Sequence, residues 1–439
     1  MRGMELRPDS LWRHRDFMYL WVGQAVSEIG SRVTMIALPL LAVITLQATT
    51  FEAALLEAAG SAAFLLVALQ AGSLVDRWRK KPVLVWSDVL RGVVLATVPA
   101  AQLAGVLTLL QLYAVALAVS VLTVFFDVAY QSYVPILVRA DQLVDGNAKI
   151  GGSASFAEVA GPSLGGALVG AVGAAYAVVA DVVSFALSTA LTGRIRDPEP
   201  PPEPRPVEIR LRTEIREGLA FVLGHPVLRK VVGCTATHNF FSNLSGAVEV
   251  VFLVRVLGAD GRTVGVVFAV GALGGLAGAV VARRLADRVG TARVVWVALL
   301  AGTPFLFARP FAFSGWGVLL VSLTGAGMAA TSVIYNVAQI SYRQTVTPRR
   351  LLGRMTASTR FVIWGVMPLG AISGGVLGTL LGVRTTLLLG AVGASLSVLW
   401  ILASPLGRVR DVADLPAELG GVSATVTPLP EPRPVQDST

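Results

Sequence analysis

Long apolar segments separated by short polar loops constrain this chain more than any other feature. A membrane-spanning helix needs about 20 mostly apolar residues, and about twelve segments meet that criterion. They cover residues 17–45, 51–75, 83–104, 107–135, 148–171, 174–193, 229–256, 261–282, 294–310, 314–337, 355–380 and 384–404. Charged residues make up only 14% of the chain, whereas a soluble domain carries about 25%. The sequence therefore predicts an all-α membrane protein.

Three features of the first six segments recur in the last six. A basic turn at residues 72–84 has a weaker copy at residues 278–293, about two hundred positions later. Tyrosine and amide side chains end the fourth and the tenth segment, at residues 130–135 and 335–342, and a glycine- and proline-rich stretch follows each, at residues 160–166 and 367–375. Such a repeat indicates two pseudo-symmetric six-helix bundles, whose glycines allow close helix packing.

The segments between the spans predict the domain organisation. We expect an N-terminal bundle over residues 1–195, a linker over 196–228, a C-terminal bundle over 229–405 and a disordered tail over 406–439. The linker starts with a stiff proline-rich stretch, and residues 208–224 alternate charged and apolar positions as in an amphipathic helix on a membrane surface. The proline-rich, polar tail has the composition of a disordered segment.

The cations predict the orientation. If the N-terminus is cytoplasmic, the inner segments hold 29 of the 36 lysines and arginines, as the positive-inside rule requires. We therefore expect a multi-pass protein of the cell (inner or plasma) membrane with both termini in the cytoplasm. The net charge of +9 lies in short clusters between apolar spans, so it is a topology signal and predicts no nucleic-acid partner.

Motifs of enzymes and primary pumps are missing from the sequence. None of the four lysines follows a glycine, so no phosphate-binding loop is present. The three histidines form no zinc pair at helical spacing, and the single cysteine, Cys234, excludes an intrachain disulfide. We expect neither enzymatic activity nor a cofactor or metal.

The loop pattern Gly-x-Leu-x-Asp-Arg-x-x-(Arg/Lys)-Lys, with twelve spans and a long central linker, resembles the major facilitator superfamily. Further residues resemble its enterobactin-exporter and macrolide-efflux branch: Trp12, Arg13, Asp16, Phe17, Leu20, Trp21, Gln24, Ser27 and Gly30, then residues 87–91, 147–148 and 160–166. The resemblance implies the major facilitator fold, with a conformational latch of the outward-open state at the basic turns. That latch would involve Gly72, Asp76, Arg77, Asp88, Arg91, Asp287 and Arg288. Ala282 and Ala286 depart from the pattern in the second turn, which leaves Asp287 and Arg288 alone there.

Ionisable side chains inside the spans are costly and need a partner or a function. The resemblance implies that spans 1, 4, 7 and 10 line a central cavity, which makes the candidate substrate-cavity residues Arg32, Tyr130, His238, Asn239, Asn243, Tyr335 and Asn336. A buried carboxylate can exchange a proton during transport. The candidates for proton coupling are, in order, Asp127, Glu28 and Glu158.

Each of these side chains also has a purely structural interpretation. Glu28 and Arg32, four residues apart on one helix face, can form an ion pair. Asp127 can accept a hydrogen bond in helix packing, His238 can be a satisfied polar side chain, and Glu249 can pair with Arg255.

The sequence favours a monomeric secondary transporter that exports a small hydrophobic or amphipathic compound, of drug, macrolide or siderophore type, with the proton as coupling ion. Two alternatives remain open. One is an uptake permease of the same fold, since fold does not determine direction, and the other is a membrane sensor that no longer transports.

Overall fold

The computed structural model describes residues 11–139, 142–196, 199, 211–347, 352–416 and 419, without the side chains of residues 68–69, 73, 76, 144, 211–216, 352–354 and 357. The described residues form helices joined by short loops. The first half consists of η1 (Leu11–Arg13), α1 (Arg15–Leu40) with the π-helical turn η2 (Leu41–Thr45), α2 (Thr50–Leu66), α3 (Ala68–Arg77), α4 (Lys80–Leu103), α5 (Leu109–Leu137), α6 (Leu143–Val172), α7 (Ala174–Ala177) and α8 (Val179–Gly193).

The second half repeats this order after the linker helix α9 (Leu211–Gly224). It consists of α10 (Leu228–Val251) with the π-helical turn η4 (Phe252–Val256), α11 (Gly261–Val289), α12 (Arg293–Ala308) with η5 (Arg309–Phe311), α13 (Gly317–Val346), α14 (Leu352–Gly365), α15 (Met367–Leu380), α16 (Val383–Leu396), α17 (Val398–Leu402), η7 (Pro405–Gly407) and η8 (Val412–Asp414).

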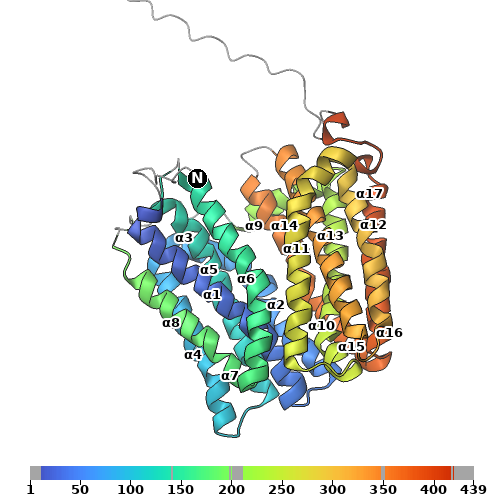
Figure 1. The fold of residues 1–439 in the computed structure, drawn as a ribbon. Helices are drawn as coiled ribbons and strands as arrows, with labels where there is room; N and C mark the ends of the chain where they lie inside the picture. The colour runs from blue at the N-terminus through green and yellow to red at the C-terminus, as the bar shows by residue number, and fades with distance from the viewer. Residues whose placement is uncertain are drawn as a thin grey trace, which may run out of the picture.

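Eleven helical spans in the described part of the chain are long and apolar enough to cross a membrane. The remaining crossing is made by α2 and α3, which are separated at Val67, where φ is −127° and ψ is −8°. The prediction of about twelve spans in two related bundles is therefore confirmed. Figure 1 shows the two bundles side by side, with α1–α8 in blue to green and α10–α17 in green to red.

Polar residues at the span ends determine where several helices begin. Thr49 and Glu52 form a capping box at the start of α2, in which each side chain accepts from the other's backbone amide. Asp260 accepts a hydrogen bond of 2.9 Å from the amide of Thr263 at the start of α11. These caps satisfy backbone amides that have no intrahelical partner. The apolar runs and the polar residues at their ends therefore determine where each helix begins.

The two bundles meet near one end of the molecule. We call the end with the turns 77–81 and 288–293 the basic face, and the other end the distal face. A Cβ atom built on Gly166 of α6 would lie 2.4 Å from the Cα of Gly265 of α11. On the other side, a Cβ atom on Gly375 of α15 would lie 2.5 Å from the Cβ of Ala54 of α2. Glycine thus brings the bundles into backbone contact towards the distal face, whereas their ribbons diverge towards the basic face (Figure 1).

A carboxylate holds each of the two basic turns in the same way. In each half, this carboxylate comes from the segment after the sixth span. Glu199 accepts hydrogen bonds from the backbone amides of Lys80 and Lys81, the latter at 3.0 Å, at the start of α4. Asp411 accepts from the amide of Thr291 at 2.8 Å, just before α12. A negative charge is favourable at a helix N-terminus. The repeat therefore extends to the contacts that secure the two turns.

Part of the predicted disordered tail is packed instead. Residues 405–416 include η7 and η8, and the carbonyl of Arg410 accepts from the amides of Ala292 and Arg293 at 3.1 and 3.2 Å. Leu415 is buried against the second bundle. These residues are ordered because the segment directly after α17 can form backbone hydrogen bonds with the turn before α12 and can bury Leu415. Residues 420–439 lie outside the described residues.

The predicted amphipathic helix is present as α9, within residues 208–224. Its Val222 is buried against Val232 of α10 and Met355 of α14. At least this part of its apolar face packs on the second bundle, which the prediction of a membrane-surface helix did not foresee.

Docking of residues 405–416 is expected to weaken in acid. The backbone amide of Thr291 stabilises the charged form of Asp411 and lowers the pKa of that carboxyl. A lowered folded-state pKa contributes stability above the unfolded pKa of about 4, and this contribution is lost as the pH falls through the folded pKa. Hydrogen exchange of the amides of residues 291–293 checks this. Protection should fall on acidification in the parent protein and should not depend on pH in Asp411→Asn. Equal pH dependence in both proteins would contradict the assignment.

Candidate functional site

A cavity of about 610 Å³ lies between the two bundles. The first bundle contributes side chains of α1 and α6, including Arg32 and Glu158. The second contributes α10 to α13 with η5, including His238, Glu249 and Asn336. Four candidates from the sequence, Arg32, Glu158, His238 and Asn336, therefore meet in one place. Because both bundles line the cavity, any movement of one against the other changes its shape.

Apolar side chains make up much of the cavity wall. They are Met35, Ile36, Val159, Val267, Phe268, Leu276, Leu299, Leu306, Met328 and Val333. Ligand sites combine such a wall with a few polar groups that orient the ligand. This cavity can therefore accept a molecule with a large apolar surface and a polar or charged group.

An ion pair that the sequence did not predict lies in the cavity wall. Glu249 of α10 pairs with Arg309 at the end of α12, and both side chains are largely buried. The suggested partner of Glu249, Arg255, instead donates to the carbonyl of Ala48 in the other bundle. That interpretation was wrong because sequence proximity placed Arg255 near Glu249, whereas the helix register turns it away.

Breaking this pair is expected to destabilise the protein. Removal of one partner of a buried ion pair costs about 3–5 kcal/mol, because the other charge stays buried without compensation. Glu249→Gln should therefore lower the thermal unfolding temperature in detergent. The double variant Glu249→Gln/Arg309→Gln should recover part of the loss, since it leaves no lone buried charge. Additive losses in the double variant would contradict the pairing.

Glu28 and Arg32 do not form the ion pair that their spacing allows. The described part of the chain shows no contact between them within ion-pair distance, and the Oε2 atom of Glu28 is buried without a hydrogen-bond partner. Glu28 instead lies in the electrostatic field of Arg32, Asp127 and Glu158 together. Asp127 and Glu158 therefore both lie close enough for their charges to act on Glu28, which the sequence could not show because the three residues come from three helices.

Asp127 of α5 is influenced by cations from both bundles. Arg91 belongs to α4 in the same bundle, and Arg360 belongs to α14 in the other. Residue spacing along α5 could not reveal a cation near Asp127, because both cations lie on other helices. The guanidinium of Arg360 also lies 5.2 Å from the centre of the Trp364 ring. If the bundles move against each other, the distance from Asp127 to Arg360 changes, whereas Arg91 moves with Asp127. The electrostatic environment of Asp127 therefore depends on the arrangement of the bundles.

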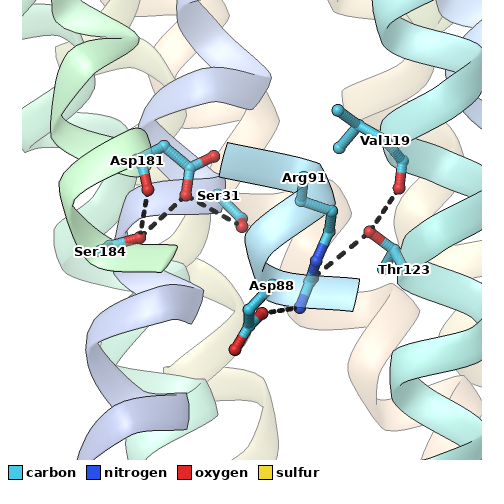
Figure 2. A network of polar contacts seen from close by, with 7 residues as sticks. All are labelled: Ser31, Asp88, Arg91, Val119, Thr123, Asp181 and Ser184. Carbon is cyan, nitrogen blue, oxygen red and sulfur yellow. Dashed lines mark hydrogen bonds and ion pairs between the residues drawn. The ribbon is translucent and has the colours of Figure 1, made fainter. Parts of the chain in front are cut away.

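Asp88 and Arg91 are buried inside the first bundle and pair with each other (Figure 2). The guanidinium also lies over the rings of Phe126 and Phe185, at 4.3 and 4.5 Å from their centres. Their proposed part in a loop latch stays a prediction. The structure places this pair about two to three turns inside α4, away from the loop itself.

Asp181 joins two helices of the first bundle. It is buried and accepts hydrogen bonds from Thr34 at 2.7 Å, Ser184 at 3.0 Å and Ser31 at 3.3 Å. Figure 2 shows the contacts with Ser31 and Ser184. These donors satisfy the carboxylate within the bundle, which gives it a structural role between α1 and α8.

Several predicted cavity residues lie elsewhere. Asn239 donates to the carbonyl of Ile363 at 3.3 Å, and Asn243 donates to the carbonyl of Asn239. Tyr335 is buried and shares a hydrogen bond of 2.6 Å with Thr235. The hydroxyl of Tyr130 is buried, has no hydrogen-bond partner in the part of the chain that the structure describes, and lies in the electrostatic field of Glu28. Asn239 and Tyr335 therefore connect helices of the second bundle, whereas Asn243 bonds within α10, and Tyr130 belongs with Glu28 in the first bundle.

Glu57 of α2 is a further carboxylate within a span, which the sequence analysis overlooked. It is exposed and lies in the field of Glu249 from the other bundle. A count of every carboxylate within the spans would have found it. The charge of Glu249, which is itself paired with Arg309, thus acts on Glu57 across the two bundles.

The predicted latch residues at the basic turns make few contacts. A Cβ atom on Gly72 would have no described neighbour within 4 Å, and Arg77, Asp287 and Arg288 are exposed. The side chain of Asp76 lies outside the described residues. A latch across the bundles therefore stays a prediction for another conformation.

The chain is similar to known membrane transporters in sequence and in fold. A family model described as transmembrane secretion effector matches residues 8–420. The multidrug efflux pump Tap of Mycolicibacterium fortuitum is 25% identical over 403 residues, which cover 87% of this chain and 93% of Tap. The uncharacterized MFS-type transporter y4rN of Sinorhizobium fredii is 30% identical over 295 residues, which cover 65% of this chain and 66% of that protein.

Solved structures share the fold at low sequence identity. A bacterial homologue of the iron transporter ferroportin in its inward-facing state matches with a TM-score of 0.71 at 14% identity, covering 89% of this chain and 98% of that chain. The outward-facing state of a bacterial ferroportin homologue gives a TM-score of 0.58 at 16% identity, covering 90% of this chain and 100% of that chain.

Proposed function

We propose that this chain, which belongs to the transmembrane secretion effector family of the major facilitator superfamily, exports a small hydrophobic or amphipathic compound by secondary active transport. The observation that carries the proposal is the cavity of about 610 Å³ that both bundles line with apolar and charged side chains. The family and the fold are those of membrane transporters and not of enzymes. The multi-pass helices require a lipid bilayer, which we take to be the plasma membrane.

Alternating access is supported by the way in which the bundles touch. Contacts between glycines close the distal face, and the better match is to an inward-facing transporter. The positive-inside rule supports a cytoplasmic basic face with both termini. In this conformation the cavity would take up substrate from the cytoplasm. Rocking of one bundle against the other would then separate Gly166 from Gly265 and release the substrate outside.

Proton coupling is supported by the position of Asp127. A nearby guanidinium stabilises the ionised form of a carboxylate. Asp127 has two such cationic neighbours, and one of them, Arg360, belongs to the other bundle. Protonation of Asp127 would remove an attraction that holds the bundles together near the basic face. A proton taken up outside would thus favour the return to the inward-facing state, which is the sign that antiport requires.

Direction is supported by the relative named as a multidrug efflux pump. The test has two stages. A strain that lacks the protein is screened against dyes, macrolides and siderophores for increased susceptibility or retention. The compound found is then loaded into proteoliposomes of the purified protein with an imposed pH gradient. Export predicts higher retention in the deletion strain and movement of the compound against the proton flow.

Other outcomes distinguish the alternatives. Lower accumulation in the deletion strain would identify an uptake permease. Binding of the compound without any flux, under every gradient, would identify a sensor. Transport that responds to sodium and not to protons would leave export intact and exclude the proton as the coupling ion.

A further inference from the structure

Each of the two basic turns borders a groove that shares no lining residue with the cavity between the bundles. The first has a volume of about 580 Å³ and the second of about 620 Å³. The first is lined by Arg77, Trp78, Arg79, Pro82, Val83, Trp86, Ser87, Leu90, Leu122 and Phe125. The second is lined by Arg288, Val289, Arg293, Trp296, Val297, Gly407 and Arg410.

The two grooves occupy equivalent places in the repeat. Residues 77, 78, 82 and 86 of the first groove correspond to residues 288, 289, 293 and 297 of the second, each 211 positions later. Two independent packing arrangements thus leave space at the same position of both bundles. A groove that recurs in this way is a property of the repeated unit and not an accident of one loop.

Both grooves are cationic. Arg77 and Arg79 are exposed, and neither has a hydrogen bond or an ion pair in the part of the chain that the structure describes. Arg288, Arg293 and Arg410 come together from α11, α12 and the segment after α17. The carboxylate of Asp411 lies 3.8 Å from the Nε atom of Arg410, and both side chains are about half exposed. The guanidinium of Arg410 also donates to the carbonyl of Arg288 at 3.3 Å. Each groove therefore has at least two guanidinium groups available to an anion.

Aromatic and apolar side chains complete the walls. Trp78 is 47% exposed and stacks on Phe125, and Trp86 is 62% exposed. In the second groove the indole Nε1 of Trp296 is buried and has no hydrogen-bond partner among the described residues. Tryptophan is enriched where a membrane meets water, because its ring is apolar and its N–H is polar. Leu90 and Leu122 continue the first groove along the apolar part of α4 and α5.

We propose that each groove binds the headgroup of an anionic phospholipid, with the phosphate on the arginines and the acyl chains along the apolar wall. Basic pockets next to membrane spans recognise anionic headgroups, and an arginine fork matches phosphate oxygens. The location supports a lipid and not a soluble phosphate, since the grooves lie where the apolar spans end. The two lipids would hold the basic turns from the membrane side, in addition to the carboxylates of Glu199 and Asp411.

Native mass spectrometry of the purified, delipidated full-length protein tests this. The protein is titrated with phosphatidylglycerol or phosphatidylcholine of the same acyl composition. We expect two phosphatidylglycerol molecules per chain, bound at least about tenfold more tightly than phosphatidylcholine. Arg79→Gln should weaken one site about fivefold, and Arg293→Gln should weaken the other by a similar factor. The double variant should weaken both.

Arg194→Gln is the matched control, because Arg194 is exposed near the basic face and lines neither groove. It should leave both sites unchanged. Equal affinity for the two lipids, or an equal loss in the control, would overturn the proposal. Displacement of the lipid by excess inorganic phosphate would show that the sites recognise free phosphate and would also overturn it. Unchanged thermal unfolding of the variants shows that they are folded. None of these outcomes depends on transport.

Discussion

Gly166→Val is expected to shift the protein from the conformation described here towards one that is open at the distal face. A Cβ atom at this position would lie 2.4 Å from the Cα and 2.9 Å from the backbone nitrogen of Gly265. Backbone atoms cannot move aside as a side chain can, so α6 and α11 must separate. Overpacking of this kind costs about 1–3 kcal/mol, which corresponds to a shift of roughly 5- to 150-fold in the equilibrium between the two conformations.

Distances between spin labels at Val172 and Phe313 measure this shift in a protein without Cys234. Both residues are exposed on the distal face, one in each bundle. The distance should increase in Gly166→Val and should be unchanged in Gly152→Val. Gly152 belongs to the same helix, and a Cβ atom there has no neighbour within 4 Å. A distance distribution equal to that of the parent protein in Gly166→Val would contradict the role of this contact.

Asp127→Asn is expected to abolish transport driven by a proton gradient while leaving substrate exchange intact. The amide cannot release a proton, so the attraction to Arg360 stays absent throughout the cycle. A pH gradient then has no group on which to act, and driven flux should fall at least about tenfold, towards the level seen without a gradient. Counterflow in proteoliposomes, with the compound found in the susceptibility screen, measures exchange and driven flux on the same preparation.

Arg360 provides the matching variants. Arg360→Gln should impair driven flux in the same direction as Asp127→Asn, whereas Arg360→Lys keeps the charge and should retain much of it. Glu158→Gln is the comparison within the cavity, because Glu158 lines it whereas Asp127 does not. Driven flux that persists in Asp127→Asn and disappears in Glu158→Gln would move the coupling role to Glu158.

The local pattern of the sequence was sufficient for the helices. The apolar runs predicted spans most of whose ends agree with the structure within about five residues, for example 83–104 against α4 (Lys80–Leu103). Two helices extend further than predicted: α11 ends at Val289 where the prediction ended at 282, and α13 ends at Val346 where it ended at 337. The glycine-rich stretch at residues 160–166 predicted close packing, and Gly161 and Gly166 indeed lie in tight helix contacts. Such features depend on neighbours in the chain, since hydrophobic length and small side chains act within one helix.

Local sequence patterns could not identify the partners of the buried charges. Spacing along α1 suggested that Glu28 pairs with Arg32, and spacing along α10 suggested that Glu249 pairs with Arg255. The structure gives Glu249 a partner 60 positions away, Arg309, and places Asp127 between Arg91 and Arg360. The packed residues 405–416 were likewise not foreseen, because their contacts lie on a turn more than a hundred residues earlier.

The sequence by itself thus determined that this protein is a duplicated helical bundle in a membrane, of the major facilitator family. Length, apolarity and the recurrence of motifs are properties of the linear chain and survive any arrangement of its helices. Only the tertiary structure decided which charges meet, which side chains line the cavity and which face is closed. Those contacts depend on the rotation and register of each helix against helices that are distant in the chain, and a rotation of one helix by a single residue would exchange them.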